Sequence, residues 1–591
     1  MTFLTILINF FFFLGLSFIA LKTCSQLKIE KSLREVCNPF LAYPVLGIVI
    51  ISFIASHLIY LKINIQWIGI FFNTLIIFFG VIFSFNLKLL DKSRYLISVI
   101  VKDKKNIYVI FLALIIFCYF ILSLSPILDA DSLAYHAQFP KYLLEKKYFG
   151  YDVFNFHDKI AGIVELFYTI PLSIQNEAGL QFVNFFSLIL IIGILEKQIA
   201  FDNQGLKRIF LISIILSPIF LQLIYSAKPQ LIFISLSLLT FAFIDKINPK
   251  KINANVLYLI IAILSFNFLG KSSFLISGFL LFLLLFFKIK KNLNLSILSK
   301  FVLCVLAFSL PTILNRFLYF EYFEINFLLN SLPMRIAGYE NFWYKLRNAQ
   351  HFYLYDLLLI IPVFVSMTFL LKPNKKYLFS FFLIFLIYFS GLRLSRFFLE
   401  PLLWSVYLVF NNNNLFLEKT KTRFFKLFLY SNIFIFSLLV FYTTVYFGKS
   451  LLSTSLKHNI LRQYSVGYEA IKIINNNIDK NKNIIYPNRQ IYYGNNNLIY
   501  PEFLSYTNNY SYHVKKMMNK KPKYLVLFNQ IASNSFYKKC NTKLILSKTI
   551  TEQKNRKDFF LKNNFDIIFN LYEINYKELD ICLVNDKKNS N

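Results

Sequence analysis

The chain contains few cysteines and few charged residues, and each shortage excludes a class of protein. Its six cysteines form no CxxC pair and no metal-ligand spacing, which argues against a zinc site and a disulfide framework. Only 16% of the 591 residues are charged, whereas a typical soluble protein has about 25%. A chain of this length would ordinarily suggest about four soluble domains. The low charge content argues against that organisation.

The shortage of charge comes with an excess of apolar residues. The chain is 57% hydrophobic, contains 71 phenylalanines and has a mean hydropathy of +0.55. A soluble core cannot bury so much apolar surface, but a bilayer accepts it. The apolar runs that can span a bilayer are 3–21, 40–60, 66–87, 107–125, 179–195, 208–225, 230–245, 254–270, 273–288, 301–316, 352–371, 377–392, 397–410 and 427–447. Several are short, so we predict an all-α polytopic membrane bundle of about 12–14 transmembrane helices.

The positive charges predict how this bundle is oriented. The first run lacks a basic segment and a cleavage site, so we interpret it as a retained helix and not as a signal peptide. With the N-terminus outside, the inward loops hold 27 of the 63 lysines and arginines, and the short outward loops hold five. Positive residues resist translocation, so this asymmetry favours an outward N-terminus. A multi-pass protein of a bacterial inner membrane follows, with its C-terminal region in the periplasm.

The domain prediction divides the chain at residue 447. Residues 1–447 form the transmembrane domain, with a first long outward loop at 126–178, and residues 448–591 form a small C-terminal α/β domain. Within that domain, Gly467–Ile478 is predicted as an amphipathic helix and Tyr524–Phe528 as a buried strand. Cys540 and Cys582 would be free to pair in an oxidising compartment.

The sharpest polar cluster follows the fourth apolar run. There Asp129 and Asp131 lie two residues apart, and Tyr135, His136 and Lys141 follow on an expected interfacial helix. One interpretation makes Asp129 or Asp131 the N-cap of that helix. The other, which we favour, gives at least one of the two a catalytic or binding role, because charges near a membrane tend to mark function.

The segment Leu128–Glu145, LDADSLAYHAQFPKYLLE, resembles the first outward loop of the GT-C superfamily of polytopic glycosyltransferases. The nearer resemblance is to bacterial enzymes of the protein mannosyltransferase and aminoarabinose transferase groups. The resemblance implies that Asp129 or Asp131 is the catalytic carboxylate. The segment 156–168, which contains Glu165, resembles a second interfacial helix of that family.

Two further segments fit the resemblance. Ser226–Gln230, which contains Lys228, occupies the place of a short polar-proline motif. The stretch Arg393–Pro401 resembles a late arginine-containing element, although Glu400 stands before its proline. Three spans precede the acidic loop here, where related enzymes commonly have one, which suggests an N-terminal extension.

The implied chemistry is sugar transfer from a polyprenyl-phosphate donor to a periplasmic glycolipid, polysaccharide or protein. A carboxylate would accept the proton of the acceptor, and cations would stabilise the leaving phosphate. The predicted catalytic residues are Asp129 and Asp131. The predicted substrate-binding residues are Tyr135, His136, Lys141, Glu165, Lys228, Lys271, Arg393 and Arg396. No cofactor is certain. A divalent cation between Asp129 and Asp131 stays open.

Two other functions compete with the transferase. One is a transporter or flippase of lipid-linked sugars, against which stands the lack of a detectable repeat. The other is an O-antigen ligase or polymerase, for which the polar cluster would be expected in a late loop. We expect membrane lipids as partners. No nucleic acid is expected, because orientation explains the inward charges and the tail lacks a nucleic-acid-binding signature.

Overall fold

The computed structural model describes the greater part of the chain, in separate ranges. The described residues are 2–86, 107–149, 162–200, 204–248, 253–270, 274–290, 299, 302–309, 395–411, 419–465, 467–480, 482–486, 491–495, 497–499, 520–528, 543–553 and 564–574. The predicted spans 352–371 and 377–392 lie outside these ranges, and so do Cys540 and Cys582. The contacts divide the chain into two compact units. The first contains Met1–Ser125, Lys146–Phe149 and Gly162–Gly448, and the second Pro126–Glu145, Gly150–Ala161 and Lys449–Asn591.

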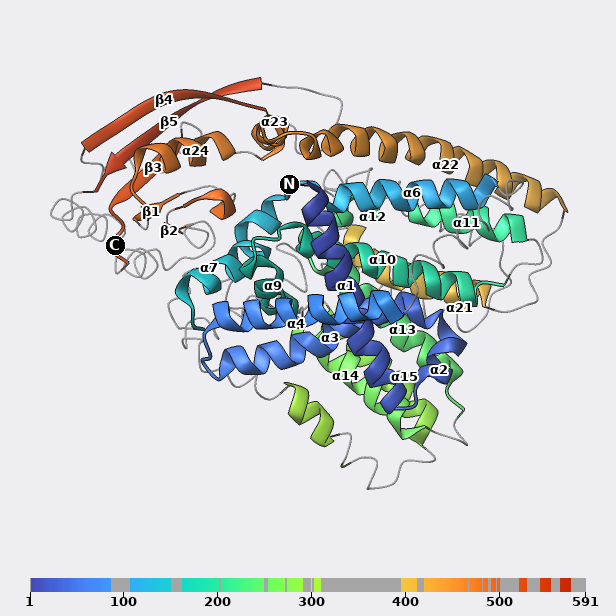
Figure 1. Ribbon diagram of the computed structural model, residues 1–591. Coiled ribbons are helices and arrows are strands. Elements are labelled where there is room, and N and C mark those ends of the chain that lie inside the picture. Colours follow the sequence, from blue (N-terminus) through green and yellow to red (C-terminus); the bar gives the residue numbers. More distant parts are fainter. Residues whose placement is uncertain are drawn as a thin grey trace, which may run out of the picture. The chain divides into compact units, whose positions relative to one another are not determined.

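The first unit is helical throughout its described parts (Figure 1). Its helices are α1 (Thr2–Gln26), α2 (Glu30–Val36), α3 (Pro39–Tyr60), α4 (Ile65–Asn86), α6 (Ile107–Ser123), α9 (Ile163–Ser173), α10 (Ala178–Gln198), α11 (Gln204–Ile215), α12 (Pro218–Ile224), α13 (Gln230–Lys246), α14 (Ala254–Gly270), α15 (Leu275–Ile289), α21 (Ser395–Phe410) and α22 (Lys419–Gly448).

Five helices among the described residues are long and apolar enough to cross a membrane. They cover Phe3–Gln26, Pro39–Tyr60, Ile65–Phe85, Ala178–Gln198 and Lys426–Leu451. Helices α11 and α12 together make a sixth candidate that is bent by 54°. Pro218 begins α12, and because proline has no backbone N–H it cannot continue the hydrogen bonding of α11. The predicted multi-pass helical membrane bundle is therefore confirmed.

Glycines allow the closest helix contacts in this bundle. A Cβ atom on Gly15 of α1 would overlap the carbonyl oxygen of Ile76 in α4, and one on Gly80 would overlap that of Phe11. Small residues let membrane helices approach closely, which gains van der Waals contact where no hydrophobic effect drives association. The pair α1 and α4 therefore packs backbone to backbone.

The ends of several helices meet at one end of the bundle, which we call the basic face. Gln198 at the end of α10 donates to the carbonyls of Glu35 and Val36, and Asn255 of α14 donates to that of Leu27. Asn411, after α21, donates to Asp245 of α13. Lys288 of α15 donates to the carbonyls of Ile244 and Asp245. Loops that the charge pattern assigns to one side of the membrane thus lie together.

The second unit contains a small mixed α/β fold, as predicted. Its helical elements are η1 (Ser132–His136), α7 (Gln138–Lys146), η5 (Lys449–Leu451), α23 (Thr454–Tyr464), α24 (Tyr468–Asn477) and η6 (Ile491–Tyr493). Its strands are β1 (Asn483–Ile485), β2 (Asn497–Ile499), β3 (Tyr524–Phe528), β4 (Lys543–Gln553) and β5 (Asn564–Glu573). The sheet has the order β2-β1-β3-β5-β4. Strands β1, β2 and β3 are parallel, and β5 runs antiparallel to β3 and β4.

The two elements predicted in the C-terminal domain are confirmed. Helix α24 lies beside the sheet (Figure 1). Its residues Ala470, Ile471 and Ile474 share one buried cluster with apolar residues of the strands. Gly467 precedes it with a φ of 90°, a conformation that glycine adopts without strain. Strand β3 coincides with Tyr524–Phe528, and four of its five residues are buried. An apolar run flanked by turn residues predicts such a strand from local sequence alone.

Candidate functional site

The two aspartates of the candidate site begin a short helix shortly after α6. Asp129 accepts hydrogen bonds on Oδ2 from the backbone N–H and the hydroxyl of Ser132, both at 2.9 Å. A carboxylate that accepts from a backbone N–H three residues later is an N-cap. The structure therefore gives Asp129 the capping role that the sequence left as one of two interpretations.

Asp131 lies within the first turn of this helix and is half-buried. The turn that follows, η1, is a π-helix. This form is rare in proteins, and where it occurs it is often at a functional site. Within η1, the rings of the adjacent residues Tyr135 and His136 lie 4.2 Å apart between centroids. His136 is buried and Tyr135 is half-buried. Asp129, Asp131, Tyr135 and Lys141 are thus the partly accessible members of the predicted cluster, and His136 is the buried one.

The acidic segment is bound to the C-terminal domain through η6. Lys141 donates to the carbonyl oxygens of Tyr492 at 2.6 Å and Gly494 at 2.8 Å, and its ammonium lies 5.3 Å from the Tyr492 ring centre. The Tyr493 hydroxyl donates to the carbonyl of Ile127 at 2.9 Å. The ammonium of Lys141 therefore holds the segment 126–145 on the domain formed by residues 449–574.

Glu165 and Lys228 are buried in the first unit. The Glu165 carboxylate is 3% exposed and accepts from the backbone N–H of Gly162 at 2.8 Å, which caps α9. A Cβ atom on Gly162 would overlap the carbonyl oxygen of Gly270, so the start of α9 lies against the end of α14. Lys271 follows this glycine, but it lies outside the described residues. Arg393 also lies outside them, and for Arg396 the structure describes only its place in α21.

Lys228 lies in the connection between α12 and α13 and is 4% exposed. The Asn184 amide donates to the carbonyls of Ser226 at 3.0 Å and Lys228 at 2.8 Å, and Gln181 donates to that of Tyr225 at 2.8 Å. The side-chain oxygens of both amides are buried, and among the described residues they have no hydrogen-bond partner. The polar-proline segment is thus held by α10 in a buried polar environment.

A buried carboxyl in α21 is a candidate that our sequence reasoning passed over. Glu400 is 4% exposed, and its carboxyl contacts the hydroxyl of Ser237 in α13 and that of Ser277 in α15. One turn further along α13 and α21, Thr240 Oγ1 and Trp404 Nε1 are buried without a hydrogen-bond partner among the described residues. The signal in the sequence was an acid inside a predicted span, which by itself marks a functional candidate.

The described residues contain no group of three histidine, cysteine or acidic side chains that could hold a metal ion. Asp129 and Asp131 alone are an incomplete set for a hard cation, which takes six or more oxygen ligands. A divalent ion between them would need oxygens from a substrate or from water. That arrangement stays a prediction.

These features define a multi-pass membrane protein with a small mixed α/β domain. The family model described as the DUF1420 N-terminal domain matches residues 86–453, so the chain belongs to this family, whose function is not established. The matched region includes both aspartates, Glu165, Lys228 and Glu400. No curated protein and no solved structure matches the chain.

Proposed function

We propose that this protein is a membrane glycosyltransferase that moves a sugar from a polyprenyl-phosphate donor to a periplasmic glycolipid, polysaccharide or protein. The observation that carries the proposal is the acidic helix start at 129–131, eight residues or fewer after the last residue of α6. A carboxylate there would lie close to the depth at which a lipid-linked phosphate meets water. The resemblance of Leu128–Glu145 to GT-C outward loops supports the same assignment.

The base in this mechanism is one of the two carboxylates, and Asp131 is the one to test first because loss of Asp129 would also remove the helix cap at Oδ2. The acceptor hydroxyl or amine attacks the anomeric carbon of the donor, and its proton passes to that carboxylate. The bond between the anomeric carbon and the phosphate oxygen breaks, and polyprenyl phosphate leaves with the electron pair. Lys228, Lys271, Arg393 and Arg396 are the cations proposed to stabilise its charge.

Mass spectrometry of glycolipids from a deletion strain first identifies the acceptor. The test then measures sugar transfer to this acceptor by the full chain in liposomes that contain a polyprenyl-phosphate sugar. Asp131→Asn should lower the transfer rate by about 10²–10⁴-fold, the usual contribution of a general base. Glu145→Gln removes an exposed carboxylate of the same segment and should leave the rate unchanged. Full activity of Asp131→Asn would exclude Asp131 as the base.

A transporter of lipid-linked sugars is the second candidate, and two observations favour it. Helices α11 and α12 form a span candidate bent by 54°, and Glu400 is a buried carboxyl among the bundle helices. Broken helices and buried ionisable groups are typical of transport pathways. A transporter would move the labelled lipid across the bilayer without forming a glycosidic bond, and Glu400→Gln would slow that movement.

A further inference from the structure

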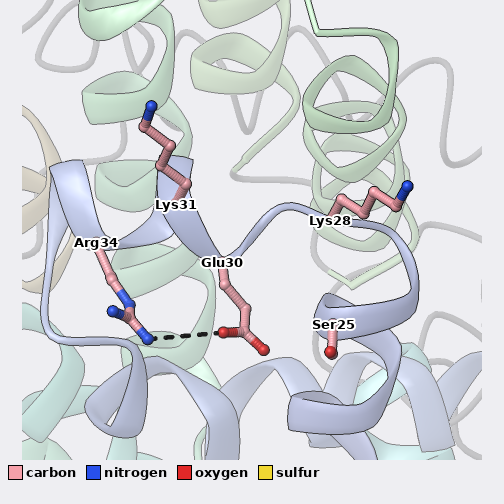
Figure 2. A pocket seen from close by; sticks show the side chains of 5 residues that line it. All are labelled: Ser25, Lys28, Glu30, Lys31 and Arg34. Atoms are coloured by element: carbon pink, nitrogen blue, oxygen red, sulfur yellow. Dashed lines mark ion pairs between the residues drawn. The ribbon is translucent and has the colours of Figure 1, made fainter.

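A polar pocket lies where α1 turns into α2. Its lining residues are Ser25, Lys28, Glu30, Lys31 and Arg34 (Figure 2). The pocket is open to its surroundings and has a volume of about 370 Å³. Three basic side chains against one carboxylate leave a formal charge of +2. Glu30 and Arg34 form an ion pair at 3.8 Å, and the amines of Lys28 and Lys31 point away from it (Figure 2). The pocket therefore has two exposed ammonium groups to offer to an anion.

The helices on either side place this pocket at the boundary of the membrane. Helix α1 ends at Gln26 and α3 begins at Pro39, and both are candidate spans. A connection of twelve residues between two such helices lies at the surface of the bilayer, at the depth of the headgroups. Leu27 and Phe40 flank the connection with exposed apolar side chains, 36% and 52% accessible. Acyl chains and glycerol are the neighbours that suit these side chains.

The backbone that carries the lysines is held firmly. Ile29, Leu33 and Val36 are each at most 1% exposed, so the apolar side of the connection and of α2 is buried. Gln198 donates to the carbonyls of Glu35 at 2.7 Å and Val36 at 2.8 Å. Cys37, at the end of α2, is likewise 1% exposed. A positioned cluster of cations loses little entropy when it binds an anion.

We propose that this pocket binds the phosphate of an anionic phospholipid headgroup. Lys28 and Lys31 contact the phosphate oxygens, and the Ser25 hydroxyl donates a hydrogen bond. Glu30 holds Arg34 and lowers the formal charge of the pocket to +2, and the exposed Leu27 and Phe40 beside it favour a phosphate that carries acyl chains over free inorganic phosphate. The site is separate from the proposed transferase residues, and its existence does not depend on that activity.

The test is native mass spectrometry of the full chain in detergent, titrated with phosphatidylglycerol, phosphatidylcholine or inorganic phosphate. We expect one saturable phosphatidylglycerol per chain at this pocket. A lysine near an anionic lipid contributes about 1 kcal/mol, or about fivefold in affinity, so Lys28→Gln with Lys31→Gln should weaken binding about 25-fold. Glu30→Gln removes the only acid of the pocket and should tighten binding.

Lys22→Gln is the matched control. Lys22 carries the same charge on the last turns of α1, but its ammonium lies 5.5 Å from the Phe18 ring centre and it does not line the pocket. Its loss should change the affinity by less than about twofold. Equal weakening by Lys22→Gln would show that general charge, and not this pocket, retains the lipid. Equal binding of phosphatidylcholine, or saturation by inorganic phosphate with no competition from lipid, would overturn the proposal.

Discussion

Asp129 and Asp131 are two residues apart, yet their surroundings differ. Both are half-buried, but Asp129 uses Oδ2 to accept from the N–H of Ser132, whereas Asp131 lies inside the first turn of the helix. The sequence indicated that one carboxylate caps the helix, but the spacing could not say which. The hydrogen bonds of the folded helix start decide between them.

Substitutions at Asp129 should show whether its side chain stabilises the helix as a hydrogen-bond acceptor or through its negative charge. Alanine removes the acceptor and should lower the free energy of unfolding of the second unit by about 1 kcal/mol. Asparagine keeps the acceptor and should cost almost nothing, because it caps helices as well as aspartate does. Fluorescence-monitored thermal unfolding should show a midpoint about 2–4 °C lower for Asp129→Ala alone. Equal midpoints for wild type and Asp129→Ala would contradict the capping assignment.

At the scale of the elements, local sequence patterns could not predict that η1 and α7 contact η6. The sequence predicted an interfacial helix after the aspartates. Its binding to residues 491–494 joins positions some 350 apart in sequence, and the acceptors there are the backbone carbonyls of Tyr492 and Gly494. Backbone acceptors carry no signature in the sequence, so Lys141 was predicted as a substrate contact. That prediction remains untested, while the structure shows what its ammonium contacts.

Replacement of Lys141 by methionine should loosen this connection. Methionine keeps most of the aliphatic length but removes both hydrogen bonds to the carbonyls of Tyr492 and Gly494. A loss of roughly 2 kcal/mol is expected, because hydrogen bonds from charged groups are the stronger ones. Amide exchange over residues 132–143 and 491–495 should then be about 30-fold faster.

Glu145→Gln is the control for this substitution. It breaks only the 3.9 Å pair between Lys141 and a half-exposed carboxylate, and such exposed pairs contribute little. Exchange should stay near that of the wild type. Unchanged exchange in Lys141→Met would mean that other contacts hold the segment.

At the scale of the whole molecule, the helix ends of the first unit that the positive-inside pattern assigns to one side of the membrane lie together. The basic face joins the ends of α1, α10, α13, α15 and α21 through the hydrogen bonds of Gln198, Asn255, Lys288 and Asn411. The opposite ends meet elsewhere, where the N–H of Ile65 donates to the carbonyl of Lys147 at 2.7 Å. The positive-inside pattern predicts that the basic face is cytoplasmic.

Single cysteines in a cysteine-free chain test this orientation. Cysteines at Lys28, Asn253 and Asn411 should resist a membrane-impermeant maleimide in spheroplasts and react once the membrane is permeabilised. Cysteines at Lys62 and Lys147 should react at once. The reverse pattern would invert the topology, and mixed labelling of the first three positions would contradict a shared basic face.

The sequence alone determined the class of this protein, because long apolar runs, loop charges and a short strand such as Tyr524–Phe528 are local signals. Twelve of the fourteen predicted spans overlap residues that the structure describes as helical. Tertiary structure decided what depends on distant partners: the contacts of Lys141, the hydroxyls around Glu400, and the pocket at Lys28 and Lys31. The physical reason is range, since hydropathy reflects each segment's own solvation, whereas a site depends on which segments pack together.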